Sequence, residues 1–197
     1  MKNLEISDLI SIGVFSALYF VMVAIATFAS AFLFGGYAYV LLPAFAALIA
    51  GSVYMLMVAK VHKFGAISMM GIVMGVYFFV SGHFVVSFAA NIVFGILADF
   101  IAKAFDYKNK KGILLSYIVF SYGCTGPVLP MWFLQNQYKA NLVARGKSAE
   151  YIAQMFANIN PTTFIICIVS IFICAFVGGI FGQIMMKKHF VKAGIVD

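Results

Sequence analysis

Charged residues are scarce in this sequence. Lysine and arginine number 13, aspartate and glutamate number 6, and together they make up 10% of the 197 residues. Soluble domains usually contain about 25% charged residues. Hydrophobic residues account for 64% of the chain, more than a soluble fold of this length could bury. The composition therefore excludes an ordinary soluble domain and predicts a protein embedded in lipid.

Sequence motifs of several enzyme classes are absent as well. The chain has no GxxxxGK[ST] loop, so we expect no ATP hydrolysis by the chain itself. It has no HExxH motif, and no serine or cysteine beside a plausible base. The 3 cysteines, Cys124, Cys167 and Cys174, lack metal-ligand or disulfide spacing and are interpreted as small apolar fillers. We therefore predict that the chain is not an enzyme and binds no metal or cofactor itself.

Long uncharged runs dominate what is present. A helix needs about 20 apolar residues to cross a hydrocarbon core of about 30 Å. Six runs are long enough, at residues 9–34, 40–59, 64–80, 84–102, 113–134 and 162–186. The first is too long for the apolar core of a signal peptide, so we expect it to be retained. We predict an all-α membrane protein with six transmembrane helices, forming a single domain over residues 1–197.

The basic residues are distributed unevenly between the predicted loops. With the N-terminus in the cytoplasm, the outer segments hold only Lys139, Arg145 and Lys147. The inner segments hold Lys2, Lys60, Lys63, Lys103, Lys108, Lys110, Lys111, Lys187, Lys188 and Lys192. Because basic residues concentrate in cytoplasmic loops, we predict a multi-pass protein of the cell membrane with both termini in the cytoplasm. The net charge of +7 then marks that face, and we expect no nucleic-acid partner.

Polar residues follow one face of the fourth predicted helix. Inside a membrane they need partners, because hydrocarbon offers no hydrogen bonds. They recur at every fourth position and so form a stripe: His83, Ser87, Asn91, Gly95, Asp99 and Lys103. We interpret Asp99 and Lys103 as an ion pair at the cytoplasmic boundary. His83, Ser87 and Asn91 lie toward the outer side, where they are either structural or in contact with a ligand.

The fifth run ends in GPVLPMWFLQNQY, which contains Pro127, Pro130 and the only tryptophan, Trp132. Each proline removes a backbone donor and distorts the helix, and distorted backbone within a membrane is tolerated where it lines a cavity. Trp132 offers a flat apolar surface, and the amides that follow it offer uncharged donors and acceptors. We predict a pocket for a small, flat, neutral ligand, lined by Trp132, Gln135, Asn136, His83 and Asn91. The alternative is that these are ordinary residues of an interfacial aromatic belt and a loop.

The connection at residues 135–161 is the longest between the runs. Within it Ile152, Met155, Phe156 and Ile159 recur at helical spacing, and Ser148 is a candidate N-cap. This short helix either lies on the lipid headgroups or forms a lid over an outward-facing pocket.

Small residues recur at helical spacing in the first and last runs. They are Gly13, Ser16 and Ala17 in the first run, and Gly178 and Gly182 in the last. In lipid, small residues let helices approach closely. These positions are either contacts within the chain or a docking face for another membrane subunit.

Several segments resemble the Trep-Strep family: ISDLISIGVFSALYF, LLPAFAALIAGSVYMLMVAKVHKFGAI, SGHF, FGILADF and MWFLQNQY. Members of this family are small six-helix membrane proteins regarded as substrate-binding S components of energy-coupling factor (ECF) vitamin transporters. The resemblance extends from Ile6 to the end of the chain. Within the family the chain is most similar to the S component assigned to hydroxymethylpyrimidine, with pyridoxine-type vitamins as a neighbouring assignment.

The resemblance implies a division of labour. An S component captures its vitamin at the outer surface and docks on a transmembrane coupling protein (EcfT-like) with two ABC ATPases (EcfA-like), which use ATP and Mg²⁺. The first helix of such proteins meets the coupling protein through an AxxxA-like motif, and Gly13 and Ala17 occupy the matching positions, with glycine replacing the first alanine. The first outer loop often gates the pocket. Its counterpart is LFGGYAY, in which Tyr37 or Tyr39 would close over a ring.

Two hypotheses from other classes stay open. The chain is a stand-alone secondary transporter or facilitator if it moves its substrate without ATP. An intramembrane enzyme has less support, because no pair of nucleophile and base can be named.

Overall fold

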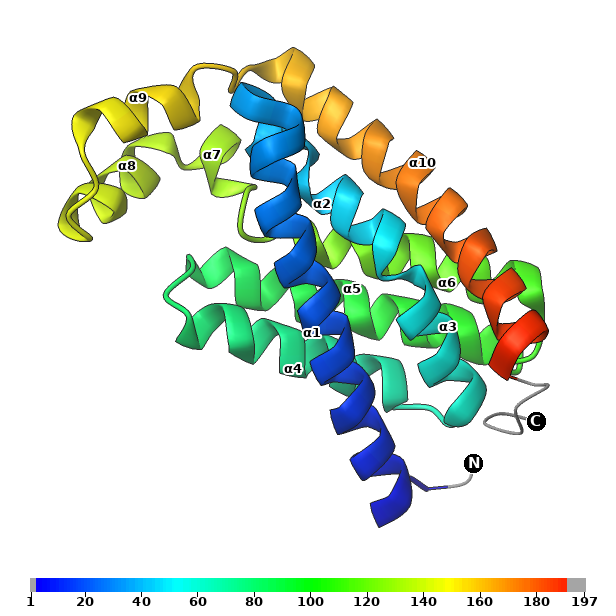
Figure 1. Ribbon diagram of the computed structural model, residues 1–197. Coiled ribbons are helices and arrows are strands. Elements are labelled where there is room, and N and C mark those ends of the chain that lie inside the picture. The colour runs from blue at the N-terminus through cyan, green and yellow to red at the C-terminus, as the bar shows by residue number, and fades with distance from the viewer. Residues whose placement is uncertain (1–2, 191–197) are drawn as a thin grey trace.

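The computed structural model describes residues 3–190, which are helical over most of their length and contain no strand (Figure 1). The elements are α1 Ile6–Phe34, η1 Gly35–Tyr37, α2 Ala38–Ile49, α3 Gly51–Lys60, α4 Ala66–Val80, α5 Val85–Ala104, α6 Lys110–Ser121, η2 Tyr122–Thr125, α7 Pro130–Phe133, α8 Gln135–Ala144, α9 Ala149–Phe156, α10 Pro161–Met185 and a π-helical turn, η3, at Met186–Phe190. An all-α architecture is therefore confirmed.

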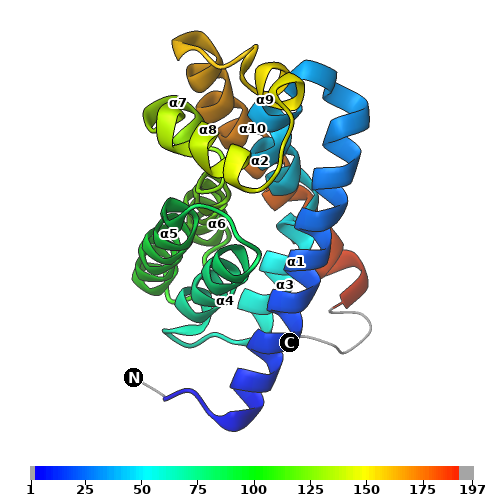
Figure 2. The same ribbon diagram turned by 90° about the vertical axis from the view of Figure 1, so that its left-hand side faces the viewer.

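The long helices form two packed layers. Helices α4, α5 and α6 lie side by side, while α1, α2, α3 and α10 cover one side of them (Figure 2). The short helices α7, α8 and α9 gather at one end of the bundle, which we call the α9 end. At the other end, which we call the basic end, one hollow is lined by Lys60, Lys63, Lys103 and Asp8 among others.

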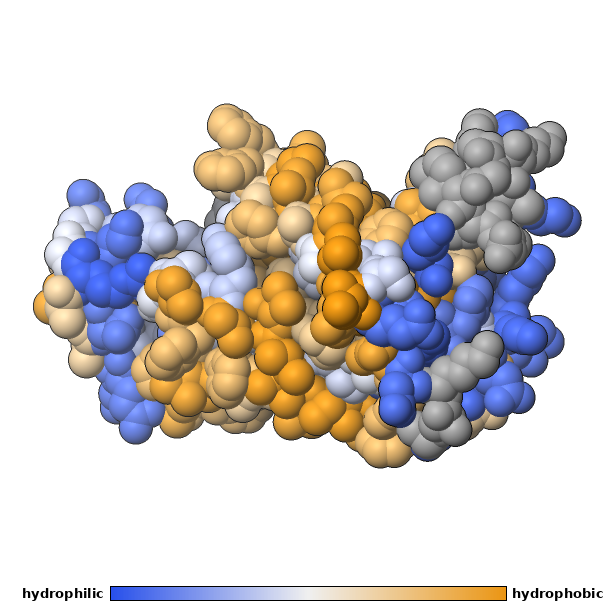
Figure 3. All heavy atoms as spheres, turned by 90° about the horizontal axis from the view of Figure 1, so that it is seen from below, coloured by the Kyte–Doolittle hydropathy of each residue, from blue (hydrophilic) through white to orange (hydrophobic). Residues whose placement is uncertain are grey.

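The surface of the bundle carries a hydrophobic band between two hydrophilic ends (Figure 3). Large apolar side chains such as Leu18 and Ile25 on α1 and Phe172 and Phe176 on α10 are exposed. An apolar surface this extensive is stable against lipid rather than water. Within the described part of the chain, three helical segments are long and apolar enough to cross a membrane: Ile6–Ile49, Val85–Ala104 and Pro161–Lys188. Helix α4 is apolar but shorter, with 15 residues.

Two of the predicted spans are not single helices. The run at 40–59 is divided at Ala50 into α2 and α3. The run at 113–134 leaves regular helix after Ser121, passes through η2 and a turn, and resumes as α7 with Pro130 in its first turn. The predicted break before Trp132 is confirmed, because proline is accommodated in the first turn of a helix but not in its interior.

Glycines bring several helices into backbone contact. A Cβ atom added at Gly178 would lie 2.6 Å from the carbonyl oxygen of Ala47, and one at Gly182 would lie 2.7 Å from that of Gly51. Gly71 and Gly95 join α4 to α5 in the same way, since a Cβ at Gly95 would lie 3.0 Å from Gly71 Cα. The hypothesis that Gly178 and Gly182 form a docking face is wrong, because α2 and α3 already cover them.

Asp99 lies fully buried on α5 and caps the start of α4. Its carboxylate accepts hydrogen bonds from the backbone N–H groups of Gly65 and Ser68, each at 2.9 Å, from the Ser68 hydroxyl at 2.8 Å and from the Tyr107 hydroxyl at 2.7 Å. The predicted ion pair with Lys103 is therefore wrong. These donors satisfy the carboxylate, and the Lys103 Nζ lies over the ring of Phe64 instead.

Candidate functional site

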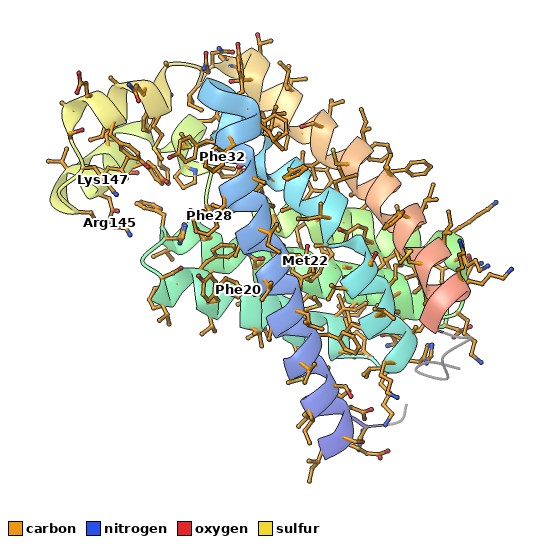
Figure 4. The ribbon with its side chains drawn as sticks, viewed as in Figure 1. Phe20, Met22, Phe28, Phe32, Arg145 and Lys147 are labelled. Atoms are coloured by element: carbon orange, nitrogen blue, oxygen red, sulfur yellow. The ribbon has the colours of Figure 1, made fainter. Side chains whose placement is uncertain are left out.

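A cavity of about 600 Å³ opens at the α9 end of the bundle. It lies between the last turns of α1, the η1 turn, the start of α2 and helix α9. Its lining residues are Thr27, Phe28, Ser30, Ala31, Gly35, Gly36, Ala38, Tyr39, Leu42, Tyr151, Gln154, Met155, Ala157 and Asn158. Figure 4 shows Phe28 on α1, beside this end of the molecule. Cavities of this size commonly hold small molecules.

The wall between α1 and α2 is shaped by two glycines. Gly35 ends α1 with φ of +50°, in the left-handed region that favours glycine. Gly36 follows in η1, and its carbonyl oxygen accepts a hydrogen bond of 2.9 Å from the Asn158 side chain. A Cβ at Gly36 would lie 2.8 Å from Asn158 Nδ2. Because Gly35 and Gly36 have no side chains, the turn lies in direct contact with the segment that follows α9.

Helix α9 forms the opposite wall. Ser148 accepts a hydrogen bond of 3.2 Å from the backbone N–H of Tyr151, so the predicted N-cap is confirmed. Ile152 and Met155 are buried in a small apolar cluster with residues of α7 and α8, including Met131 and Leu142. The apolar face of α9 is therefore covered by protein. The other side of the helix presents Tyr151 and Gln154 to the cavity.

A tyrosine pair links the two walls. The hydroxyl oxygens of Tyr39 on α2 and Tyr151 on α9 lie 2.7 Å apart. In such a pair one hydroxyl donates its proton to the oxygen of the other. The remaining oxygen lone pairs can accept a hydrogen bond from a ligand. Because the link joins α9 to the bundle across the cavity, it also limits how far α9 can move away.

The lining carries no charged side chain. Its polar groups are the hydroxyls of Thr27, Ser30 and the two tyrosines, and the amides of Gln154 and Asn158. Thr27 and Ser30 donate their protons to carbonyl oxygens of their own helix, at 2.9 and 3.0 Å, so their oxygens remain acceptors. Beside these groups stand the Phe28 ring, Leu42 and Met155. The cavity suits a ligand that is neutral, partly apolar and able to form hydrogen bonds.

Trp132 does not line this cavity. Its ring packs against Phe164 with ring centroids 5.6 Å apart, and its Nε1–H donates a hydrogen bond of 3.0 Å to the carbonyl oxygen of Asn160. The side chain thereby joins α7 to the start of α10. Its predicted place in the pocket is wrong, because the break in the chain turns the ring toward α10 instead.

The polar stripe of α5 contacts the unwound segment after α6. Asn91 is buried, donates to the carbonyl oxygen of Ser87 at 2.8 Å and lies against Gly123. A Cβ at Gly126 would lie 2.6 Å from Ser87 Cα. Ser87 and Asn91 therefore pack against backbone, and the predicted convergence of Asn91, His83 and Trp132 on one pocket is not formed.

His83 lies in the turn between α4 and α5. Its Nδ1 is 3.0 Å from the Ser81 hydroxyl, and its ring meets the edge of Phe78. Arg145, at the end of α8, donates a hydrogen bond of 2.9 Å to the carbonyl oxygen of Gly82 (Figure 4). Partial burial, and then the nearby Arg145 charge, lower the pKa of His83 below its usual range. His83 is thus a neutral part of the contact between α8 and this turn.

The remaining predicted pocket residues divide between the cavity and the surface. Gln135 begins α8, and Asn136 is exposed. Tyr37 is 47% exposed and lies outside the lining, whereas Tyr39 is the one predicted residue that lines the cavity. Four residues that line the cavity were not predicted from the sequence: Thr27, Ser30, Tyr151 and Asn158. Thr27 and Ser30 did carry a signal, since they are polar residues about one turn apart near the end of an apolar run.

The sequence profile of one protein family matches residues 6–192, nearly the whole chain. The chain belongs to the Trep_Strep family. The family is described as hypothetical bacterial integral membrane proteins, and the hydrophobic band agrees with that description. No curated protein and no solved structure matches the chain.

The exposed face of α1 is the remaining candidate surface of this Trep_Strep protein. Gly13 and Ala17 are exposed, and a Cβ added at Gly13 would meet no atom within 4 Å. Ser16 is buried and points into the bundle. Of the three small residues predicted at this face, two are accessible to another molecule.

Proposed function

We propose that the chain is the substrate-capture (S) subunit of an ECF-type ATP-driven importer. In this proposal it crosses the cell membrane six times, with both termini in the cytoplasm, and the α9 end faces outward. The uncharged cavity at the end opposite Lys60, Lys63 and Lys103 carries the proposal. It is large enough for a metabolite and is bordered by a short helix attached through a few hydrogen bonds.

The proposed ligand is a small neutral heteroaromatic vitamin or precursor of the hydroxymethylpyrimidine or pyridoxine type. The rings of Phe28, Tyr39 and Tyr151 offer apolar and stacking surfaces, and hydroxyls and amides offer partners for ring nitrogens and hydroxyl groups. A strongly charged ligand would lose its hydration without an opposite charge in return. The cavity is larger than a single six-membered ring, so we expect η1 and α9 to close around the ligand.

Energy would come from companion subunits. The chain has no phosphate-binding loop. We therefore propose that it docks on a transmembrane coupling protein (EcfT-like) with two ABC ATPases (EcfA-like), which use ATP and Mg²⁺. The accessible Gly13 and Ala17 on α1 would permit close approach of a partner helix.

Ligand capture is tested by titrating the purified protein with hydroxymethylpyrimidine and pyridoxine. Loss of one hydrogen bond in Tyr39→Phe should cost about 1 kcal/mol of binding energy, which is about a fivefold higher Kd. Tyr37→Phe is the matched control, because Tyr37 lies outside the cavity, and it should bind like the parent. Equal affinities for both variants, or no binding of either compound, would count against the proposed site and ligand class.

Coupling is tested by uptake into vesicles with and without the three companion subunits. We expect uptake only with the companions and ATP. Ala17→Leu should keep ligand affinity and abolish uptake, whereas Val21→Leu, on the same exposed side of α1, should change both little. ATP-independent uptake by the chain alone would favour the secondary-transporter alternative.

A further inference from the structure

The α8–α9 hairpin, residues 135–156, carries the charge of the α9 end. Its basic residues are Lys139, Arg145 and Lys147, and its one acid is Glu150. No other aspartate, glutamate, lysine or arginine occurs in residues 9–59, 64–98 or 112–186. Three cations against one acid, with His83 neutral, give this end a net charge of +2.

Glu150 does not neutralise any of the three cations. No ion pair within residues 3–190 includes its carboxylate. Glu150 lies in the first turn of α9, where the positive end of the helix dipole stabilises a negative charge. The acid is therefore offset by its own helix rather than by a neighbouring lysine or arginine.

Both lysines of the hairpin lie over aromatic rings of α9. The Nζ of Lys139 lies 4.6 Å from the centroid of the Phe156 ring. The Nζ of Lys147 lies 5.2 Å from the centroid of the Tyr151 ring. A ring face attracts a cation and orients it but brings no opposite charge. The two side chains are thus held in place while they keep their full charge.

Arg145 and Lys147 lie together at the tip of the hairpin, and both are exposed (Figure 4). Arg145 donates one hydrogen bond, of 2.9 Å, to the carbonyl oxygen of Gly82. The other N–H groups of its guanidinium remain available as donors to an anion such as phosphate. The tip therefore offers two adjacent cations to a molecule outside the protein.

Exposed apolar side chains accompany these cations. Phe133 on α7 and Val143 on α8 are each more than half exposed. The hairpin belongs to one of the two hydrophilic ends that border the hydrophobic band (Figure 3). Basic and exposed apolar residues together, at the edge of such a band, are typical of a segment at the headgroup level of a membrane.

We propose that the α8–α9 hairpin binds the headgroups of anionic phospholipids, with lipid phosphates beside Arg145 and Lys147. Guanidinium and ammonium groups bind phosphate through charge-assisted hydrogen bonds, and basic segments beside a membrane are attracted to anionic lipids. A zwitterionic headgroup fits less well, because its own cation opposes the net charge of the hairpin. The proposal does not depend on the ligand of the cavity, on companion subunits or on the side of the membrane that the α9 end faces.

Amide hydrogen exchange of the full chain in lipid nanodiscs tests the proposal. One set of discs contains phosphatidylcholine alone, and the other contains an equal mixture of phosphatidylcholine and phosphatidylglycerol. We expect residues 145–153 to exchange more slowly in the mixed discs. The difference should largely disappear in about 1 M salt, where charges are screened beyond about 3 Å.

Lys147→Gln should reduce the protection of these residues about fivefold in the mixed discs, because one basic residue near an anionic surface contributes about that factor. It should change little in phosphatidylcholine alone. Lys147→Arg keeps the charge and should behave like the parent. Lys108→Gln is the matched control, since Lys108 is exposed at the basic end, and it should leave exchange in the hairpin unchanged.

Three results would overturn the proposal. The first is equal exchange of residues 145–153 in the two kinds of disc. The second is an equal loss of protection in both discs for Lys147→Gln, which would assign the effect to its contact with Tyr151 alone. The third is an effect of Lys108→Gln on the hairpin as large as that of Lys147→Gln.

Discussion

The two ends of the bundle are held together by different means. Toward the basic end, α10 meets α2 and α3 through bare backbone at Gly51, Gly178 and Gly182, and the buried Asp99 satisfies four donors. At the α9 end, the short helices border a cavity. They attach to the long helices through ring contacts, such as Trp132 against Phe164, and through single hydrogen bonds. One is the tyrosine pair, and another joins Asn158 to Gly36.

The glycine-packed half of the bundle is therefore a rigid scaffold, and we expect the α9 end to be the part that moves. Close-packed interiors do not deform gradually, whereas elements with few buried contacts open locally at low cost. The small apolar cluster beneath α9 is formed mainly by residues of α7, α8 and α9. We therefore expect a ligand to enter by displacement of α9 and η1, while the glycine-packed half keeps its shape.

The largest expected effect is at the helix contacts of the scaffold. Gly178→Ala places a methyl group in contact with the backbone of α2, and such overpacking costs about 1–3 kcal/mol or more. The variant should show a large fall in Tm in a detergent melt, or fail to fold. Gly13→Ala makes the same change at an exposed position of α1 with no neighbour within 4 Å, and should leave Tm close to the parent. Equal Tm values for the two variants would contradict the distinction between a packed and an open face.

The next effect concerns the buried cap of α4. Asp99→Asn removes a charge that accepts four hydrogen bonds, so we expect a loss of about 1–3 kcal/mol in the free energy of unfolding. Ligand affinity should be unchanged, because the cavity is at the other end. Asp106→Asn, an exposed acid close by, should have little effect. If Lys103→Gln destabilised the protein as much as Asp99→Asn, the ion pair expected from the sequence would be correct after all.

Features that depend on neighbouring residues were predictable from the sequence. The helix break at Pro127 and Pro130, the Ser148 cap and the apolar side of α9 were predicted from local rules on proline, capping and helical spacing, although regular helix already ends after Ser121. The hydrophobic band follows from composition alone. Each of these was confirmed because the deciding interaction lies within a few residues along the chain.

Features that depend on distant residues were not predictable. Asp99 has a lysine four positions away, yet its donors come from the start of α4 and from Tyr107. Gly178 has the spacing of a docking motif but is covered by α2. Trp132 was expected in the pocket because of its chemistry, and the fold turns it toward Phe164. Spacing along the chain identifies a face of a helix, but the partner of that face is chosen by the tertiary fold.

A smaller effect is expected at the attachment of α9. Asn158→Ala removes the hydrogen bond to the Gly36 carbonyl, which contributes about 1 kcal/mol. Amide hydrogen exchange in residues 149–158 should rise about fivefold, with Tm close to that of the parent. Gln154→Ala is the control, since Gln154 lines the cavity without a side-chain bond to the α1–α2 turn. Uniformly unchanged exchange in Asn158→Ala would mean that the apolar cluster under α9 is sufficient to hold it.

The smallest expected effect is a pH dependence at the contact between α8 and the α4–α5 turn. Burial and Arg145 lower the pKa of His83 in the folded state, so the unfolded state binds the proton more readily. The stabilisation is complete above the unfolded pKa of about 6.5 and is lost as the pH falls through the folded value. Because the ring is partly exposed, the loss should be about 0.5 kcal/mol or less. It is measured as the fall in Tm between pH 7.5 and pH 5, which should be smaller in His83→Asn than in the parent. An equal fall in Tm in both proteins would show that protonation of His83 does not weaken the Arg145 contact.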